Sequence, residues 1–315
     1  MSHYLKEYKW SNVFTMVRNL QSKPRICTKT FNRHLVVITG ATSGIGFATA
    51  KKYASRGADL LFINRNEQKS ELLCETLKGE YNTNCSYFLA DFMKLSDIHA
   101  VAEKLSRLDR NIDVLIHNAG IYNTRRILTE DQLEAVFQTN YLSTFILNYS
   151  LIEKFRNQAS GRILFVNSEA YRFAAFGLDM DDLSWKRNRY SGIKSYGAAK
   201  LAQLLSMLKL NECFQETGVT INAMHPGNVQ TNSGQNNGIV YRYFKRILLD
   251  RNSQPVDFAA EALYYLGVSD EVANSSGKFY NLTTEEEPAP PALDKAAAEK
   301  LWNISLELGG FHEKK

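Results

Sequence analysis

The sequence lacks long hydrophobic runs, paired cysteines and clustered histidines. No stretch of about 18 apolar residues occurs in its 315 residues, so no membrane span is predicted, and no apolar signal-peptide segment is present. The six histidines are scattered, which predicts no metal site. No two of the four cysteines have the spacing of metal ligands or of a redox pair. We therefore expect free thiols in a reducing, cytoplasmic compartment. These are Cys27, Cys74, Cys85 and Cys213.

A surplus of positive charge is confined to the N-terminal arm, residues 1–33. The arm carries seven lysines and arginines against the single acid Glu7, a surplus larger than the net charge of +5 of the whole chain. The body is therefore close to neutral, which argues against a nucleic-acid surface. Apolar residues at helical spacing predict a helix from Trp10 to Leu20, ended by Pro24. Such a helix either packs on the body or docks peripherally on a membrane.

Apolar runs alternate with helical patterns from residue 34 onward. Hydrophobic residues make up 44% of the chain, enough for a large core. The alternation predicts an α/β fold of the Rossmann type, a doubly wound parallel sheet of seven strands in the order 3-2-1-4-5-6-7. One dinucleotide-binding and catalytic domain is expected over 34–284, with an acidic, proline-containing linker and a C-terminal helix over 285–315. The predicted strands are 35–39, 59–64, 86–90, 112–117, 162–167, 219–224 and 277–281.

A glycine-rich turn follows the first predicted strand and precedes a helix. Gly40 permits the tight turn, and Gly44 and Gly46 let backbone approach a pyrophosphate at the helix N-terminus. Ser43 and Ile45 complete the predicted cofactor-binding turn. Because the spacing is Gly-x-x-x-Gly-x-Gly, it favours one class of dinucleotide fold over those with Gly-x-Gly-x-x-Gly.

Further polar residues stand at the ends of later strands and on one helix. Tyr196 and Lys200 are four residues apart, hence on one helix face, and Ser168 ends the fifth strand. Asn140 lies in an apolar helix predicted to begin at a capping box, residues 129–132. In order and spacing the set resembles the short-chain dehydrogenase/reductase family. The segment 178–191 and the tail 288–308 resemble its retinol-dehydrogenase-like branch.

The resemblance implies roles for the polar residues. Tyr196 would be the acid/base, Lys200 would lower the pKa of that tyrosine and hold the nicotinamide ribose, and Ser168 would bond the substrate oxygen. Asn140 would hold a water against Lys200. The other implied cofactor contacts are Asp91 and Phe92 at the adenine, Asn118, Ala119 and Gly120 at the ribose, and Pro226, Gly227 and Thr231 at the nicotinamide. His117 replaces the family's usual first asparagine, a change expected to affect sheet support.

The end of the second strand bears on the choice of cofactor. NAD enzymes place an acid there for the ribose 2′-hydroxyl, whereas this chain has Asn64 followed by Arg65. Arginine suits a 2′-phosphate, which favours NADP(H) over NAD(H). Two observations weigh against this: Arg65 could be a solvated residue opening the next helix, and Ser43 stands where many NADP enzymes have a basic residue.

The substrate is not encoded in these motifs. The branch resemblance implies hydride transfer to or from a lipophilic alcohol, aldehyde or ketone, such as a retinoid or steroid, with residues 232–250 as a substrate lid. Two alternatives stay open: a double-bond reductase of the protochlorophyllide type, and a non-catalytic dinucleotide-binding regulatory protein. The complete Ser168, Tyr196 and Lys200 set favours carbonyl chemistry. Monomer and homo-oligomer are equally compatible with the sequence.

Overall fold

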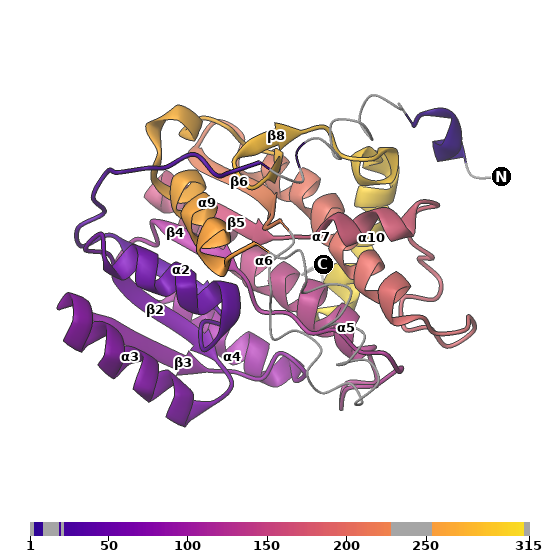
Figure 1. Ribbon diagram of the computed structural model, residues 1–315. Coiled ribbons are helices and arrows are strands. Elements are labelled where there is room, and N and C mark those ends of the chain that lie inside the picture. Colours follow the sequence, from indigo (N-terminus) through magenta and orange to yellow (C-terminus); the bar gives the residue numbers. More distant parts are fainter. Residues whose placement is uncertain (1–2, 9–18, 20–21, 228–253, 312–315) are drawn as a thin grey trace.

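The computed structural model describes residues 3–8, 19, 22–227 and 254–311. A central sheet carries helices on both faces (Figure 1). Its strands follow the order β3-β2-β1-β4-β5-β6-β7-β8, and β1 to β7 are parallel, which confirms the predicted class and order. The strands are β1 (Leu35–Thr39), β2 (Asp59–Asn64), β3 (Cys85–Leu89), β4 (Val114–His117), β5 (Ser160–Val166), β6 (Gly218–His225), β7 (Phe279–Asn281) and β8 (Thr284–Glu286).

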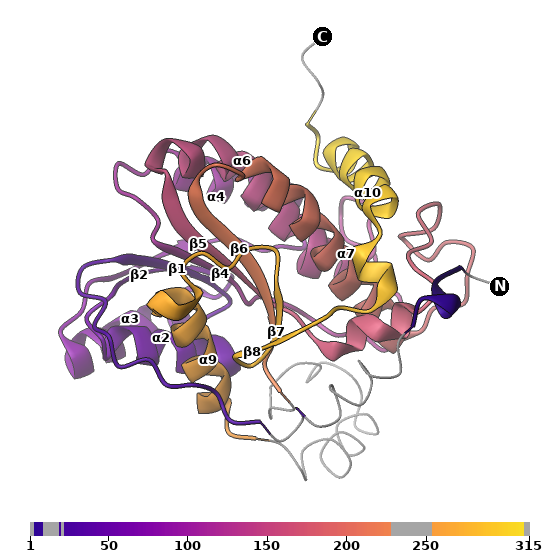
Figure 2. The same cartoon turned by 90° about the horizontal axis from the view of Figure 1, so that it is seen from above.

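Two helical layers bury the two faces of the sheet. In β1, Val36 and Ile38 pack in one core cluster and Leu35 and Val37 in the other, because side chains alternate along a strand. Figure 2 shows α2, α3 and α9 on one side of the strands and α4, α6 and α7 on the other, with α10 outside α7. The helices are α2 (Gly44–Ala54), α3 (Glu67–Tyr81), α4 (Leu95–Ser106), α5 (Ala135–Phe137), α6 (Ser143–Gln158), α7 (Gly192–Cys213), α9 (Val256–Val268) and α10 (Lys295–Leu308).

The sheet has one more strand than the sequence predicted. β8 pairs antiparallel with β7 after a two-residue turn, in which Leu282 has a φ of 53°. A turn this short can only join antiparallel strands, whereas the parallel strands need a crossover. The acidic segment predicted to begin a linker therefore starts inside the sheet. Glu286 is buried there, and its Oε1 accepts a hydrogen bond from Asn19 Nδ2 at 2.8 Å.

The predicted helix start at residues 129–132 is wrong. Gln132 has a φ of 60°, which no helix accommodates, and the helix begins at Ala135. Its N-cap is the buried Glu134, whose carboxylate accepts from Phe137 N at 2.8 Å. The same carboxylate accepts from Ser195 Oγ at 3.0 Å, so a distant helix selects the cap. A capping-box pattern carries no such tertiary information.

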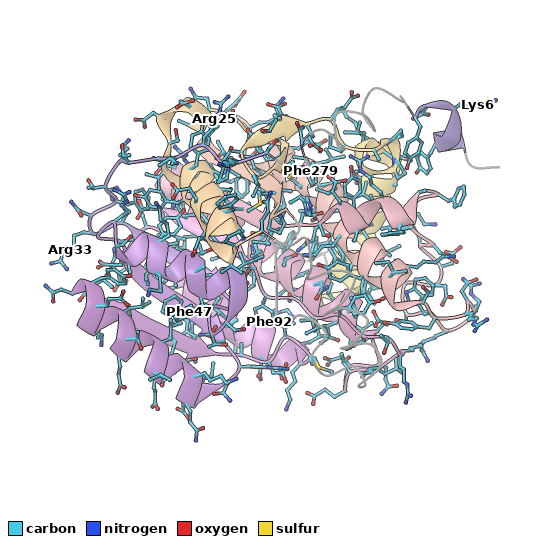
Figure 3. The ribbon with its side chains drawn as sticks, in the orientation of Figure 1. Lys6, Arg25, Arg33, Phe47, Phe92 and Phe279 are labelled. Atoms are coloured by element: carbon cyan, nitrogen blue, oxygen red, sulfur yellow. The ribbon has the colours of Figure 1, made fainter. Side chains whose placement is uncertain are left out.

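The described part of the N-terminal arm packs on the body. Cys27 is buried, and Figure 3 shows Arg25 on the arm beside α9. Arg25 pairs with Glu271 at 3.0 Å and Lys29 with Asp270 at 2.7 Å, both through exposed side chains that contribute little to stability. The predicted helix over Trp10 to Leu20 lies outside the described residues apart from Asn19. None of the helices that the structure describes is long and apolar enough to cross a membrane.

Close packing of α2 on α9 depends on Gly267. A Cβ at this position would lie 1.9 Å from Tyr53 Oη, which donates a hydrogen bond to Leu263 O at 3.1 Å. Gly267→Ala must push the buried tyrosine or the helix aside. We expect it to lower the free energy of unfolding by about 1–3 kcal/mol in urea denaturation.

Gly79 in α3 is the matched control for this substitution. A Cβ there would have no atom within 4 Å, so Gly79→Ala should raise the free energy of unfolding by about 0.5–1 kcal/mol. Equal stability of the Gly267→Ala protein and the unmodified protein would show that α2 and α9 tolerate a wider separation.

Candidate active site

The glycine turn connects β1 to α2 at the carboxyl edge of the sheet. Gly40 and Gly44 have φ values of 69° and 58°, which favour glycine. A Cβ at Gly44 would meet nothing within 4 Å, so its surroundings are open. Ser43 precedes α2 with an extended backbone, and its side chain caps no amide. The first amides of α2, at Ile45 among them, therefore have no side-chain cap and suit a phosphate group.

Gly46 is required for a different reason from the one expected. It lies inside α2, where a Cβ would come within 2.4 Å of Gly40 O and 2.5 Å of Asn118 Nδ2. The glycine lets the helix approach the turn and the neighbouring strand end. Close helix–strand packing by itself accounts for this third glycine.

The turn after β4 packs directly against the glycine turn. Asn118 Nδ2 donates to Thr39 O at 3.1 Å and to Gly40 O at 2.8 Å. Thr39 Oγ1 accepts from the amides of Asn118 and Ala119, both at 3.0 Å. A Cβ on Gly120 would lie 3.4 Å from Asn140 Oδ1. The three residues predicted at the cofactor ribose thus join the glycine turn to Asn140.

Asn64 and Arg65 differ in exposure at the end of β2. Asn64 is buried; its Oδ1 accepts from Ala41 N at 2.8 Å and its Nδ2 donates to Ser70 Oγ at 3.1 Å. This amide supports the glycine turn, and both of its ends are hydrogen-bonded within the protein. Arg65 is exposed, so its guanidinium is accessible to an anionic group near the turn.

Asp91 and Phe92 follow β3, as expected. Asp91 Oδ1 accepts from Met93 N at 3.0 Å, which fixes the carboxylate at the start of the turn. The Phe92 side chain is only 6% exposed and packs in the core. Its predicted contact with an adenine edge is therefore limited to the small exposed part of the ring.

Tyr196, Lys200 and Ser168 come together at the carboxyl edge of the sheet. Tyr196 and Lys200 lie on α7, and Lys200 Nζ is 5.7 Å from the centre of the Tyr196 ring. Ser168 follows β5 and caps the short 3₁₀ helix Glu169–Ala174, where its Oγ accepts from Ala170 N at 3.2 Å. The Ser168 hydroxyl also lies close enough to Tyr196 to lower the pKa of the tyrosine. The predicted convergence of these three residues is therefore present in the structure.

Burial perturbs both titratable groups of the site. It raises the pKa of Tyr196 to about 12, and the neighbouring Ser168 hydroxyl opposes this shift. It lowers the pKa of Lys200 to about 7. The sequence led us to expect a lowered tyrosine pKa. In the protein itself desolvation outweighs the lysine charge, because the Lys200 ammonium is also removed from water and bonded to neutral groups.

Asn140 sits in a π-helical turn, Gln138–Leu142, between α5 and α6. Both ends of its side chain bond Ile121: Oδ1 accepts from Ile121 N at 2.7 Å and Nδ2 donates to Ile121 O at 2.9 Å. Its backbone carbonyl accepts from Gln203 Nε2 at 2.8 Å. The amide of Gln203 thus joins Asn140 and Lys200, the two residues that the resemblance connects through a water.

Sequence reasoning missed several polar residues of the site. Gln203 and Asn167 are buried beside Lys200, and Glu134 is buried beneath Tyr190 and Ser195. The pKa of the Glu134 carboxyl is raised by burial. A usable signal existed for Gln203, since it follows Lys200 by three residues and so shares its helix face. Glu134 gave no such signal, because its partners are about 60 residues away in sequence.

The remaining predicted residues divide between described and undescribed parts of the chain. Pro226 and Gly227 follow β6 and are buried, with a φ of 76° at Gly227. Thr231 and the predicted lid at 232–250 lie outside the described residues. His117 is buried, with Nε2 2.9 Å from Asn148 Oδ1, and burial lowers its pKa to about 4. In the residues that the structure describes, no three His, Cys, Asp or Glu side chains gather as metal ligands.

Comparison with known proteins agrees with this geometry. The family model described as "short chain dehydrogenase" matches residues 34–179. Retinol dehydrogenase 13 from Homo sapiens is 33% identical over 287 residues, covering 88% of this chain and 84% of that protein. Retinol dehydrogenase 14 from Homo sapiens is 32% identical over 293 residues, covering 88% and 86%.

Solved structures share the fold. An uncharacterized protein from Mycobacterium paratuberculosis has a TM-score of 0.71 and 27% identity, over 90% of this chain and 95% of that one. A short-chain dehydrogenase from Sphingobium yanoikuyae has a TM-score of 0.63 and 23% identity, over 89% and 96%. Motifs, topology and similarity agree, and the chain belongs to the short-chain dehydrogenase/reductase family, in its retinol-dehydrogenase-like branch.

Proposed function

We propose that this protein is an NADP(H)-dependent oxidoreductase that interconverts a carbinol and a carbonyl group on a lipophilic substrate. The observation that carries the proposal is the convergence of Ser168, Tyr196 and Lys200 at the same edge of the sheet as the uncapped N-terminus of α2. The three side chains can transfer a proton and bind a substrate oxygen, and the helix N-terminus can bind a pyrophosphate. A bound nicotinamide supplies the hydride acceptor or donor.

The proton chemistry belongs to Tyr196. In the reductive direction its hydroxyl protonates the substrate oxygen, and in the oxidative direction its phenolate takes the proton back. Ser168 donates a hydrogen bond to the same oxygen as negative charge develops there. The Lys200 ammonium, 5.7 Å from the tyrosine ring centre, favours the phenolate electrostatically.

Arg65 supports NADP(H) as the cofactor. Its exposed guanidinium stands at the end of β2, next to the residue that braces the glycine turn, and can form paired hydrogen bonds with a phosphate. The structure of the Sphingobium yanoikuyae relative is a complex with NADPH, which agrees with this assignment.

Exposed apolar side chains around the site support a lipophilic substrate. Phe173 and Phe176, soon after Ser168, are 60% and 68% exposed. A Cβ on Gly197 would lie 3.3 Å from Phe173 Cβ, so Phe173 stands beside the catalytic tyrosine. The relatives named as retinol dehydrogenases make retinoids and similar alcohols or aldehydes the first compounds to test.

Carbonyl chemistry is favoured over double-bond reduction. The Ser168 hydroxyl lies close enough to Tyr196 to lower its pKa, so both hydroxyls can reach one substrate oxygen, as polarisation of that oxygen requires. The assay is a panel of retinoid, steroid and short-chain carbonyls and alcohols, followed by NADPH absorbance. Absence of turnover across the panel, with NADPH still bound, would favour the non-catalytic alternative.

Arg65→Ala should weaken NADPH binding about tenfold or more and change NADH binding little. Only NADPH has the 2′-phosphate with which the guanidinium can pair, and charged hydrogen bonds contribute about 1.5–3 kcal/mol. The measurement is titration of cofactor fluorescence. Arg107→Ala is the control, because Arg107 is an exposed arginine at the end of α4 that pairs with Glu103. Equal weakening of both cofactors in Arg65→Ala would contradict the assignment.

Tyr196→Phe should lower the turnover rate by a factor of about a hundred or more. The affinity for NADPH should stay within about threefold of that of the unmodified protein. The change removes the proton donor and keeps the ring, and general acid catalysis contributes about 10²–10⁴-fold. Tyr149→Phe is the control, since Tyr149 lies on α6 and packs against Trp302. Steady-state rates and cofactor titration check both variants. Turnover near the unmodified rate in Tyr196→Phe would exclude this mechanism.

A further inference from the structure

A single buried amide joins three parts of the site. Gln203, on α7 one turn after Lys200, is fully buried. Its Nε2 donates to Asn140 O at 2.8 Å, and its Oε1 accepts from Lys200 Nζ at 3.1 Å. The Oε1 also accepts from Asn167 Nδ2 at 3.1 Å. Both lone pairs of this oxygen are therefore used.

The orientation of this amide is dictated by its partners. A lysine ammonium can only donate and a backbone carbonyl can only accept. The Gln203 oxygen must therefore face Lys200, and the nitrogen must face Asn140. A flipped amide would place its nitrogen against the donor Lys200 Nζ and its oxygen against the Asn140 carbonyl oxygen. Buried polar groups do not tolerate such donor–donor and acceptor–acceptor contacts.

We propose that Gln203 is a positioning residue that holds the Lys200 ammonium and connects it to the Asn140 carbonyl. Its side chain makes the connection between Lys200 and Asn140 that the family resemblance assigns to a water molecule. An amide anchored on the same helix as Lys200 cannot exchange with solvent, so the link is permanent. The inference concerns the proposed catalytic site and rests on the proposed function for its catalytic consequence.

Gln203 supplies one of two neutral acceptors for the buried ammonium. Lys200 Nζ donates to Val166 O at 2.7 Å and to Gln203 Oε1, which leaves one N–H for other partners. A buried lysine loses its proton readily unless acceptors compensate for lost hydration. Removing either acceptor should therefore disfavour the charged form. Among the described residues, the titratable groups facing Lys200 are Tyr196 on α7 and His117 on β4.

Asn167 extends the link to Ser168. Its Nδ2 donates to Lys200 O at 3.0 Å as well as to Gln203, and its Oδ1 accepts from Ser168 N at 2.8 Å. Gln203 and Asn167 therefore form a pair of amides between the lysine and the serine. Displacing Gln203 therefore loosens the positions of both Lys200 and Ser168.

The test measures the pKa of Lys200 directly in the full-length protein. Lysine labelled with ¹³C at Cε gives one resonance per residue, and Lys200→Arg identifies the resonance of Lys200. Gln203→Met keeps the volume and removes the acceptor, so the pKa of Lys200 should fall by about one unit. Gln203→Glu places a carboxylate beside the ammonium, so the pKa should rise. The two variants should shift the pKa of Lys200 in opposite directions. Either one therefore tests the proposal alone if the other fails to fold.

Gln158→Met is the matched control. Gln158 also uses both ends of its amide, accepting from Ile112 N at 3.1 Å and donating to Ile112 O at 2.7 Å, but at the opposite edge of the sheet. It should lower thermal stability and leave the Lys200 pKa unchanged. An unchanged Lys200 pKa in the folded Gln203 variants would overturn the proposal.

Kinetics separate this inference from the proposed function. For alcohol oxidation, Gln203→Met should lower kcat about tenfold, raise KM less, and move the acid limb of the pH profile upward by about one unit. The shift follows because less positive charge near Tyr196 disfavours its phenolate. If the unmodified protein oxidises no substrate, the proposed function fails, and the Lys200 titration still decides the role of Gln203.

Discussion

The ammonium of Lys200 is removed from water, and the catalytic edge of the sheet is built to compensate for this. A buried charge persists only with hydrogen-bond acceptors around it, and here they are neutral carbonyl oxygens from Val166 and Gln203. Val166 is the last residue of β5, so the position of the sheet edge sets one acceptor. α7 sets the other. The strand and the helix must keep their relative position for the lysine to hold its charge.

The parallel sheet brings the other half of the site to the same edge. Thr39 at the end of β1 binds the amides of the turn after β4, and Gly46 allows α2 to pack closely on that turn. Gly120 in turn faces Asn140, which accepts from Gln203. A chain of direct contacts therefore connects the glycine turn to Lys200. The proposed phosphate site at one end and the proposed proton-transfer residues at the other are held by one framework.

Much of this could be predicted from the sequence, because it depends on local patterns. Apolar runs located seven strands, and the four-residue spacing of Tyr196 and Lys200 placed both on one helix face. Predictions failed where a tertiary partner decided the outcome. Glu134 caps α5 because Ser195 and Tyr190 help to hold its carboxylate, and β8 forms because β7 has a free edge beside a two-residue turn. The partners of Glu134 are about 60 residues away in the sequence, whereas β8 follows β7 by two residues and its short acidic sequence does not resemble a strand.

Asn64 and Gln203 show why residue type alone does not assign a role. Asn64 stands where NAD enzymes have an acid, yet its amide is consumed by Ala41 and Ser70, which leaves the exposed Arg65 to meet a ligand. Gln203 shares a helix face with Lys200, but its significance depends on Asn140, 63 residues earlier in the chain. An amide has separate donor and acceptor ends, so its role follows from what each end meets. That information exists only once the helices are packed.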